Sequence, residues 1–355
     1  MTPKFFCTGG AVVKTIIKIE IVILVLALLV GGAMCAISGG VLTLLEEPVV
    51  VEYEPLPIPT DAPMEIAEPE VTGPVTFPPQ KTSEKTAEKT EKSTGTTELT
   101  AKKYFVYDVR QGEYLQKVGN ETEKLYPASI TKLLTSYVVL QYLQPDEVIV
   151  AGDALDLVPE DSSVAEIKVG DKLTVEQLIE AMMLPSGNDA AQMAAVAAGR
   201  RIAQNENLVP TRAVEVFMEE MNAQAKALGM ENSNFVTPDG FHRDNHYTTM
   251  NDLVTLCQKV LTEPVILKYT SRAKEEVTLS GRTVEWKNTN MLLHKDWKYH
   301  MPNTIGLKTG YTDMAGGCLV SAFFEEDRIL LIGVFGATPY TEDRYLDTVD
   351  IYNSL

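Results

Sequence analysis

The segment from Ile21 to Leu45, IVILVLALLVGGAMCAISGGVLTLL, contains no charged residue. An apolar run of this length is sufficient for a helix to cross the hydrocarbon core of a bilayer, where a helix satisfies its own backbone hydrogen bonds. The sequence therefore predicts an N-terminal transmembrane helix over residues 21–45. Residues 1–20 and the remainder of the chain must then lie on opposite sides of a membrane.

The charges that flank this run predict its orientation. The preceding charged residues are Lys4, Lys14, Lys18 and Glu20, and those just after it are Glu46, Glu47, Glu52 and Glu54, with no Lys or Arg. The positive-inside rule makes residues 1–20 a cytoplasmic N-terminus and places the rest of the chain outside the cell membrane. The alternative is a cleaved signal peptide and a secreted protein. The run is longer than the usual signal-peptide core, which favours an uncleaved anchor.

Residues 46–100 differ sharply in composition from their neighbours. Prolines recur from Pro48 to Pro79, and a tract rich in Thr, Lys and Glu follows. Such a segment has too little apolar surface to offset the entropy of ordering, so it is predicted to be a disordered linker before a globular domain at residues 101–355. The net charge of −18 argues against nucleic acid as a partner, because phosphate binding requires clustered Lys and Arg.

Strands are predicted at both ends of the globular domain, with helices between them. Hairpins are expected over residues 102–118 and 275–286, helices near 129–143, 174–200 (interrupted at 185–187), 212–228, 249–261 and from 342, and strands at 303–310, 317–324 and 328–336. This order predicts an α+β fold in which both ends of the domain contribute to one antiparallel sheet, with flanking helices and an all-helical subdomain.

The four cysteines do not indicate a disulfide framework. Only Cys257 and Cys318 belong to the predicted globular domain, since Cys7 and Cys35 precede the linker. Small folds held by disulfides carry many more cysteines for their size. Both cysteines of the domain lie in apolar sequence, so we expect two small buried hydrophobic side chains.

The pattern Ser-x-x-Lys occurs at Ser129–Lys132 and again at Ser271–Lys274. Only Ser129 begins a strongly apolar helical segment, where a spacing of three residues puts its hydroxyl and the Lys132 amine on one face. A lysine shielded from water can lose its proton and act as the base that a serine nucleophile needs. The alternative is that Ser129 caps a helix and Lys132 is solvated.

Two further motifs follow in the chain, Ser186-Gly-Asn188 and Lys308-Thr-Gly310. The first lies between two predicted helices, where a tight turn can present a hydroxyl and an amide to a cleft; a helix cap is the alternative. The second ends a predicted strand, where Gly310 allows a bound peptide to approach closely; a turn with a surface lysine is the alternative. All three motifs at suitable sites make chance an inadequate explanation.

This motif set is known from penicillin-binding proteins and class A β-lactamases. With MLPSGNDAA, NFVTPDGFHRDNHYTT, NTNMLL and GLKTGYTDMAGGCLV, the chain from about residue 102 to 336 resembles the low-molecular-mass D-alanyl-D-alanine carboxypeptidases of the serine S11 type. The resemblance implies a β-lactamase/transpeptidase-like fold. It also implies removal of the terminal D-Ala from peptidoglycan pentapeptide stems through an acyl-serine, with no metal or organic cofactor.

The resemblance also implies a role for each motif residue. Ser129 would be the acylated nucleophile, Lys132 its general base, and Ser186 a proton relay to the leaving D-alanine. Asn188 would orient the substrate amide, and Lys308, Thr309 and Gly310 would bind the end of the substrate that carries the carboxylate. The oxyanion would be held by the backbone N–H groups of Ser129 and Tyr311, which are fixed dipoles of the kind that lower acyl-transfer barriers.

The chain departs from the pattern of many relatives in several places. Asp239-Gly-Phe241 stands where many have His-Gly-Leu, and residues after 336 are too few for the C-terminal β-rich domain that many carry. Many relatives are also anchored by a C-terminal amphipathic helix, whereas this chain has its apolar run near the N-terminus. The first departure is expected to leave the core mechanism intact.

Expected partners are a stem peptide ending in D-Ala-D-Ala, β-lactam antibiotics as covalent inhibitors, and the cytoplasmic membrane through residues 21–45. Three alternatives remain on the same fold: a D,D-endopeptidase, a β-lactamase-like hydrolase, and a catalytically silent sensor. The Glu-x-x-Leu-Asn loop of class A β-lactamases is not found. His242 and His246 are spaced like zinc ligands, but no convincing third ligand is nearby, so we expect them to fix a loop.

Overall fold

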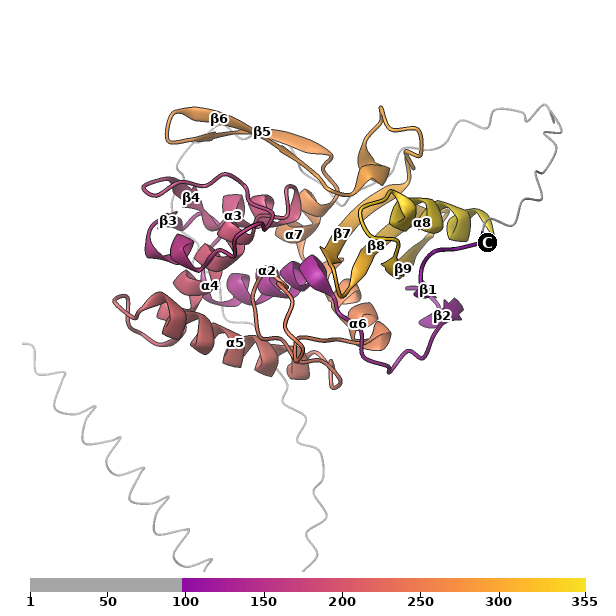
Figure 1. Cartoon of the computed structure of the whole chain (residues 1–355), viewed down its shortest axis with the longest axis horizontal. Helices are drawn as coiled ribbons and strands as arrows, with labels where there is room; N and C mark the ends of the chain where they lie inside the picture. The colour runs from indigo at the N-terminus through magenta and orange to yellow at the C-terminus, as the bar shows by residue number, and fades with distance from the viewer. Residues whose placement is uncertain (1–97) are drawn as a thin grey trace, which may run out of the picture. The chain divides into compact units, whose positions relative to one another are not determined.

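A computed structural model describes residues 98–355, which form a five-stranded antiparallel sheet and a block of helices (Figure 1). The strands are β1 (Lys103–Asp108), β2 (Glu113–Val118), β7 (Thr304–Thr312), β8 (Gly316–Glu325) and β9 (Arg328–Ala337). They are ordered β2-β1-β9-β8-β7, so the first two strands of the domain lie beside the last three. The prediction that both ends of the domain share one antiparallel sheet is confirmed.

Both faces of this sheet are covered, which explains the nearly continuous apolar sequence of β8 and β9. Successive side chains of a strand point to opposite faces. Val320 and Leu331 therefore belong to the large core shared with the helical block, whereas Leu319 and Ile332 belong to a second core. The final helix, α8 (Asp343–Asn353), contributes Tyr345 and Ile351 to that second core. The sheet thus lies between two layers of helix.

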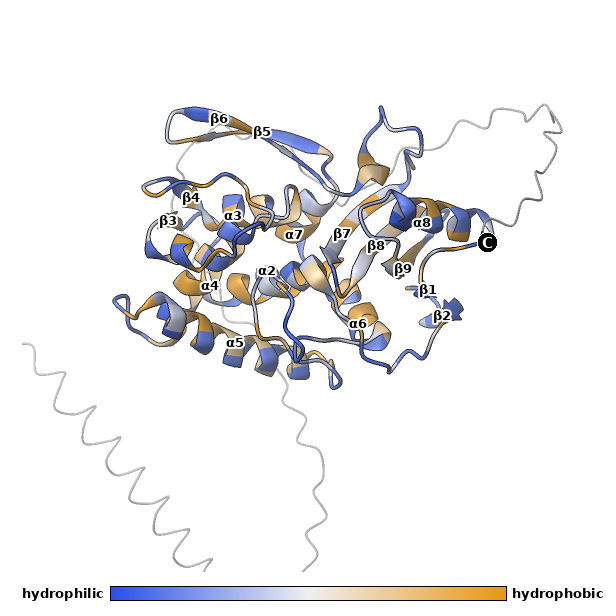
Figure 2. Cartoon of the chain, in the orientation of Figure 1, coloured by the Kyte–Doolittle hydropathy of each residue, from blue (hydrophilic) through white to orange (hydrophobic). Residues whose placement is uncertain are grey.

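The helical block is built around α2, whose residues from Thr131 to Val139 are all buried. Its helices are α2 (Thr131–Tyr142), α3 (Val175–Met183), α4 (Asn188–Ile202), α5 (Pro210–Ala227), α6 (Met250–Val260) and α7 (Pro264–Thr270). The outer helix α5 is amphipathic: Phe217, Met221 and Ala225 recur at helical spacing on its buried face, and Figure 2 shows hydrophilic residues between the apolar ones. The predicted helices are confirmed.

Several short elements were not predicted from the sequence. They are the two-stranded sheet of β3 (Val148–Val150) and β4 (Lys172–Thr174), the 3-10 turns η1 (Ala128–Ile130), η2 (Asp153–Leu157) and η3 (Met291–Leu293), and α7. Pro264 occupies the first turn of α7, where its missing N–H costs no hydrogen bond. The hairpin of β5 (Lys274–Leu279) and β6 (Arg282–Lys287) agrees with prediction.

Residues just before the predicted domain start at 101 also contact the folded domain. Leu99 contacts the second core, and the backbone N–H and hydroxyl of Thr100 both donate to the buried carboxylate of Asp347. Cys257 and Cys318 are free thiols in the buried core, as predicted. The predicted anchor at residues 21–45 and most of the predicted linker lie outside the described residues. Within residues 98–355, no helix is both long and apolar enough to cross a membrane.

Candidate active site

Ser129 lies in the turn η1, immediately before α2, and two glycines allow neighbouring backbone to approach this turn closely. A Cβ atom on Gly240 would lie 1.9 Å from the carbonyl oxygen of Ala128, and one on Gly310 would lie 2.7 Å from that of Pro127. Neither η1 nor α2 has a side-chain cap. The alternative that Ser129 serves as a helix cap is therefore wrong.

The Lys132 side chain is fully buried, and its amine has a complete set of partners. Nζ lies 2.9 Å from the Ser129 hydroxyl, 2.7 Å from Asn188 Oδ1 and 2.7 Å from the carbonyl oxygen of Asp239. The amide and carbonyl oxygens can only accept, so they take two N–H groups. The hydroxyl can also donate, so a neutral amine can direct its lone pair toward Ser129. The alternative of a solvated Lys132 is wrong.

Burial also makes it easier for this amine to lose its proton. Desolvation lowers the pKa of Lys132 to about 8, although the negative charges of Asp239 and Asp189 oppose the shift. A pKa lowered in this way makes the neutral amine more accessible near neutral pH than it is for a solvated lysine. The amine is therefore close to the pKa that suits a general base near neutrality.

Ser186 and Lys308 form a second buried pair. Lys308 Nζ donates to the Ser186 hydroxyl at 2.9 Å and to the Thr309 carbonyl oxygen at 3.2 Å, and its side chain is 1 % exposed. Burial, together with the charges of Lys132 and Arg344, lowers the pKa of Lys308 well below its ordinary value. The two alternatives for these motifs, a helix cap and a surface lysine, are both wrong. The N-cap residue of α4 is Gly187, which has no side chain to cap the helix.

The prediction that the third motif ends its strand is also wrong, because β7 continues to Thr312. As the last strand of the sheet, β7 has one edge that pairs with no other strand among residues 98–355. The motif therefore lies within a free strand edge, onto which an extended peptide could add. This edge passes directly beside the serine turn, as the tight contact of Gly310 requires.

A cavity of about 880 Å³ joins these elements. It is lined by Ser129, Ser186, Asn188, Thr309, Gly310 and Tyr311 from the predicted set, with Glu160 to Ser163, Asp239 to His242, Thr289, Thr312 to Met314, Tyr340 and Arg344. Lys132 and Lys308 lie behind this lining, each hydrogen-bonded to a serine on it. All eight predicted site residues are thus brought to one cavity or directly behind its wall.

Arg344 and Thr289 were missed from the sequence. Arg344 of α8 donates to the Gly310 carbonyl oxygen at 3.0 Å, while its buried Nε has no hydrogen-bond partner in the described part of the chain. The Thr289 hydroxyl lies 2.6 Å from that of Thr309. A single charged residue on a predicted helix does not indicate that its side chain will reach a distant cavity. The signal that could have found Thr289 is its place in the quoted NTNMLL segment.

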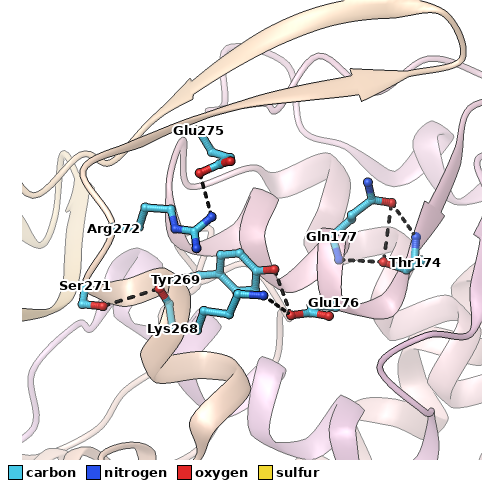
Figure 3. A network of polar contacts seen from close by, with 8 residues as sticks. All are labelled: Thr174, Glu176, Gln177, Lys268, Tyr269, Ser271, Arg272 and Glu275. Carbon is cyan, nitrogen blue, oxygen red and sulfur yellow. Dashed lines mark hydrogen bonds and ion pairs between the residues drawn. The ribbon is translucent and has the colours of Figure 1, made fainter. Parts of the chain in front are cut away.

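The other residues considered from the sequence have structural roles. His246 is 2 % exposed, its Nε2 lies 2.8 Å from the Thr131 hydroxyl, and its Nδ1 accepts from the Val236 N–H at 3.1 Å. Burial lowers its pKa to about 4, so the ring is neutral and fixes the loop. The second Ser-x-x-Lys pattern is separated in the structure. The Ser271 hydroxyl donates to the carbonyl oxygens of Leu267 and Lys268 in α7, the second of which Figure 3 shows, and Lys274 pairs with Glu285.

Solved structures define the class of this fold. The Streptomyces K15 DD-transpeptidase is 28% identical with a TM-score of 0.63, over 72% of this chain and 96% of that chain. Penicillin-binding protein D2 from Listeria monocytogenes, in its cefotaxime-bound form, is 29% identical with a TM-score of 0.59 over the same shares. The domain therefore has the penicillin-binding transpeptidase fold.

The family follows from the sequence comparisons. The model of the D-alanyl-D-alanine carboxypeptidase family, peptidase S11, matches residues 87–338, and the chain belongs to this family. D-alanyl-D-alanine carboxypeptidase DacA of Escherichia coli K12 is 31% identical over 69% of this chain and 58% of its own length. DacF of Bacillus subtilis is 29% identical over 62% of this chain and 53% of its own length. The chain thus spans a little over half of the length of each of these two relatives.

The environment of Lys132 can be tested by NMR of full-length protein labelled with ¹³C at lysine Cε. We expect one resonance, absent from the Lys132→Met variant, to titrate near pH 8, because burial disfavours the ammonium form. In Asp239→Asn, which keeps the side-chain shape, we expect the midpoint to move to lower pH, because a charge that stabilises the ammonium is removed. Titration of Lys132 above pH 10, or an upward shift in the variant, would contradict this description.

Proposed function

We propose that this protein is a serine D-alanyl-D-alanine carboxypeptidase, which removes the terminal D-Ala from peptidoglycan pentapeptide stems through an acyl-serine intermediate. The main support is the contact between Ser129 and Lys132. The serine hydroxyl lies on a cavity, and behind it is an amine whose other two partners can only accept hydrogen bonds. Membership of the peptidase S11 family points to the same reaction.

In the proposed acylation step, Ser129 Oγ attacks the carbonyl carbon of the penultimate D-Ala, and its proton passes to Lys132 Nζ. Negative charge develops on the carbonyl oxygen, where the backbone N–H groups of Ser129 and Tyr311 would stabilise it. Collapse of this intermediate breaks the peptide bond. The leaving amine takes up a proton by way of Ser186, and free D-Ala departs. Water then hydrolyses the ester and restores the serine.

The walls of the cavity also suit the end of such a substrate. Lys308 provides positive potential behind Ser186, and the Thr309 hydroxyl can donate to a carboxylate once it accepts a hydrogen bond from Thr289. Arg344 adds a guanidinium whose Nε lacks a partner. Asn188 lies beside the nucleophile, where it could hold the substrate amide. We propose that these groups bind the terminal carboxylate and the amide of D-Ala-D-Ala.

β-Lactams are proposed as covalent inhibitors, because their ring amide would acylate the same serine. Support comes from the Listeria relative, whose structure is that of a cefotaxime-bound penicillin-binding protein. A carboxypeptidase, a D,D-endopeptidase, a β-lactamase-like hydrolase and a silent sensor share this first binding step. They differ in what happens to the acyl group and in which peptide is cleaved.

Labelling with a fluorescent penicillin and mass spectrometry of diacetyl-Lys-D-Ala-D-Ala test this proposal together. The wild-type protein should become labelled and should release D-Ala. Ser129→Ala should lose both activities, because no other group can form the ester. Ser271→Ala is the matched control, since it removes the serine of the second Ser-x-x-Lys pattern, and it should behave like wild type.

The outcomes of that experiment separate the alternatives. Labelling with an unchanged tripeptide would reject carboxypeptidase activity in favour of a sensor. Rapid loss of the label as hydrolysed penicillin would favour a β-lactamase, and cleavage of a crosslinked peptide dimer in preference to the tripeptide would favour an endopeptidase. An unlabelled wild-type protein would reject all four.

Arg344→Met tests the proposed carboxylate contact. A hydrogen bond to a charged group is worth about 1.5–3 kcal/mol, so kcat/KM for diacetyl-Lys-D-Ala-D-Ala should fall by roughly 10- to 100-fold. The same peptide with a C-terminal amide is the control. It should already be a poor substrate for wild type, and the variant should not make it poorer. Equal losses on both peptides would show that Arg344 acts only on the structure.

We further propose that residues 21–45 anchor the protein in the cytoplasmic membrane, with residues 46–100 as the linker that carries the domain to the cell wall. Support comes from the uncharged apolar run and from the charges around it. The full chain should fractionate with carbonate-washed membranes, and its intact mass should include residues 1–20. A soluble extracellular protein whose N-terminus lies beyond residue 30 would instead establish a cleaved signal peptide.

A further inference from the structure

One wall of the active-site cavity consists of Glu160 to Ser163, part of a segment between η2 and β4 without helix or strand. Two of its non-glycine residues have left-handed backbone, Asp161 with φ of 58° and Glu166 with φ of 61°. Such conformations cost free energy and persist only where the surrounding structure holds them. The shape of this wall must therefore be set by contacts from elsewhere in the fold.

The first set of contacts comes from the start of α4. The Asp189 carboxylate is 3 % exposed and accepts from the backbone N–H groups of Ala165 at 2.9 Å and Ile167 at 3.1 Å. The N–H of Asn188 donates to the Ser163 carbonyl oxygen at 2.8 Å. The side chain of the same Asn188 accepts from Lys132. The wall is thus attached to the residues that surround the proposed base.

The second set comes from the β5–β6 hairpin. The Trp286 ring is 1 % exposed, and its Nε1–H donates to the Ala165 carbonyl oxygen at 2.9 Å. Arg282 donates to the Glu166 carbonyl oxygen at 2.7 Å and pairs with Asp171. Ala165 is thereby held on both sides, its N–H by Asp189 and its carbonyl by Trp286. These hydrogen bonds fix the direction in which the backbone groups of the wall point.

The base of the hairpin is joined to α7, because Asn288, which follows β6, donates from its side-chain amide to the Thr270 carbonyl oxygen at 3.2 Å. The hairpin forms a two-stranded sheet of its own, apart from the five-stranded sheet (Figure 1). At its base, Arg272 pairs with Glu275 at 2.6 Å, and Lys268 and Tyr269 of α7 both contact Glu176 of α3 (Figure 3). A hairpin outside the five-stranded sheet therefore contacts the cavity wall from a separate direction.

We propose that Trp286 is a positioning residue that shapes this wall for the part of the stem peptide preceding D-Ala-D-Ala. A cavity of about 880 Å³ has the size of sites that hold drug-sized ligands, and a terminal dipeptide leaves much of it unfilled. The nucleophile, Thr309 and Arg344 account for that dipeptide. The part of the lining from Glu160 to Ser163 is then available to contact the rest of the acyl donor. The inference depends on the proposed carboxypeptidase function.

Trp286→Phe tests this role, because it keeps a large buried ring and removes the N–H donor. Full-length protein would be assayed on acetyl-D-Ala-D-Ala and on the pentapeptide L-Ala-γ-D-Glu-L-Lys-D-Ala-D-Ala. Loss of one hydrogen bond is expected to raise KM for the pentapeptide roughly fivefold. We expect kcat for the pentapeptide and kcat/KM for the short peptide to change less than twofold.

Two further variants make the result interpretable. Glu276→Gln changes an exposed residue of the same hairpin and should leave both substrates unaffected. Arg282→Ala removes the hairpin's other contact to the wall, and it should reproduce the pentapeptide-selective effect even if Trp286→Phe fails to fold. Thermal unfolding of each variant would report whether the fold is intact.

The outcomes separate this inference from the function on which it depends. Equal losses on the two peptides in Trp286→Phe and Arg282→Ala would show a general structural role and overturn the inference, as would the absence of any effect in folded variants. If the wild-type protein released D-Ala from neither peptide, the proposed function would fail, and the inference with it. If the wild-type protein cleaved both peptides and the variants affected the short and the long peptide equally, the inference would fail while the proposed function remained.

Discussion

The buried amine of Lys132 is the group on which the rest of the site depends. A charged ammonium taken from water into the interior loses several kcal/mol of hydration, and the protein can reduce that cost by releasing the proton. Burial alone would therefore favour a neutral lysine. The nearby charges of Asp239 and Asp189 limit this effect and hold the pKa near 8, so both protonation states are accessible near neutrality.

Three separate parts of the fold converge to make this environment. The helical block provides Lys132 on its central helix and Asn188 at the start of α4. The sheet brings its free edge against the serine turn, and Gly310 removes the one side chain that would prevent that approach. The last helix adds Arg344. No single element contains a working site, which explains why both ends of the domain must meet in one sheet.

The sequence predicted the parts of this arrangement that have a local pattern. Helical spacing identified Ser129 and Lys132 as neighbours, whereas Ser271 follows the last residue of α7 and Lys274 is the first residue of β5. Contacts between distant segments were not predictable in this way. Arg344 reaches the cavity across the chain, and the hydrogen bond from Trp286 to Ala165 joins residues whose local sequence shows no motif. Such contacts depend on the tertiary structure, which brings distant segments of the chain together.

The two buried lysines are also coupled through their charges. The positive charge of Lys132 lowers the pKa of Lys308, so protonation of either amine makes a second proton less favourable at the other. In the proposed acylation, Lys132 gains a proton from Ser129, and its repulsion with Lys308 then rises. Lys308 already donates to the Ser186 hydroxyl, which leaves that hydroxyl free to donate its own hydrogen. Passing a proton through Ser186 to the leaving amine would relieve the repulsion, as would its return to Ser129, so the coupling of the two lysines keeps this proton available for transfer.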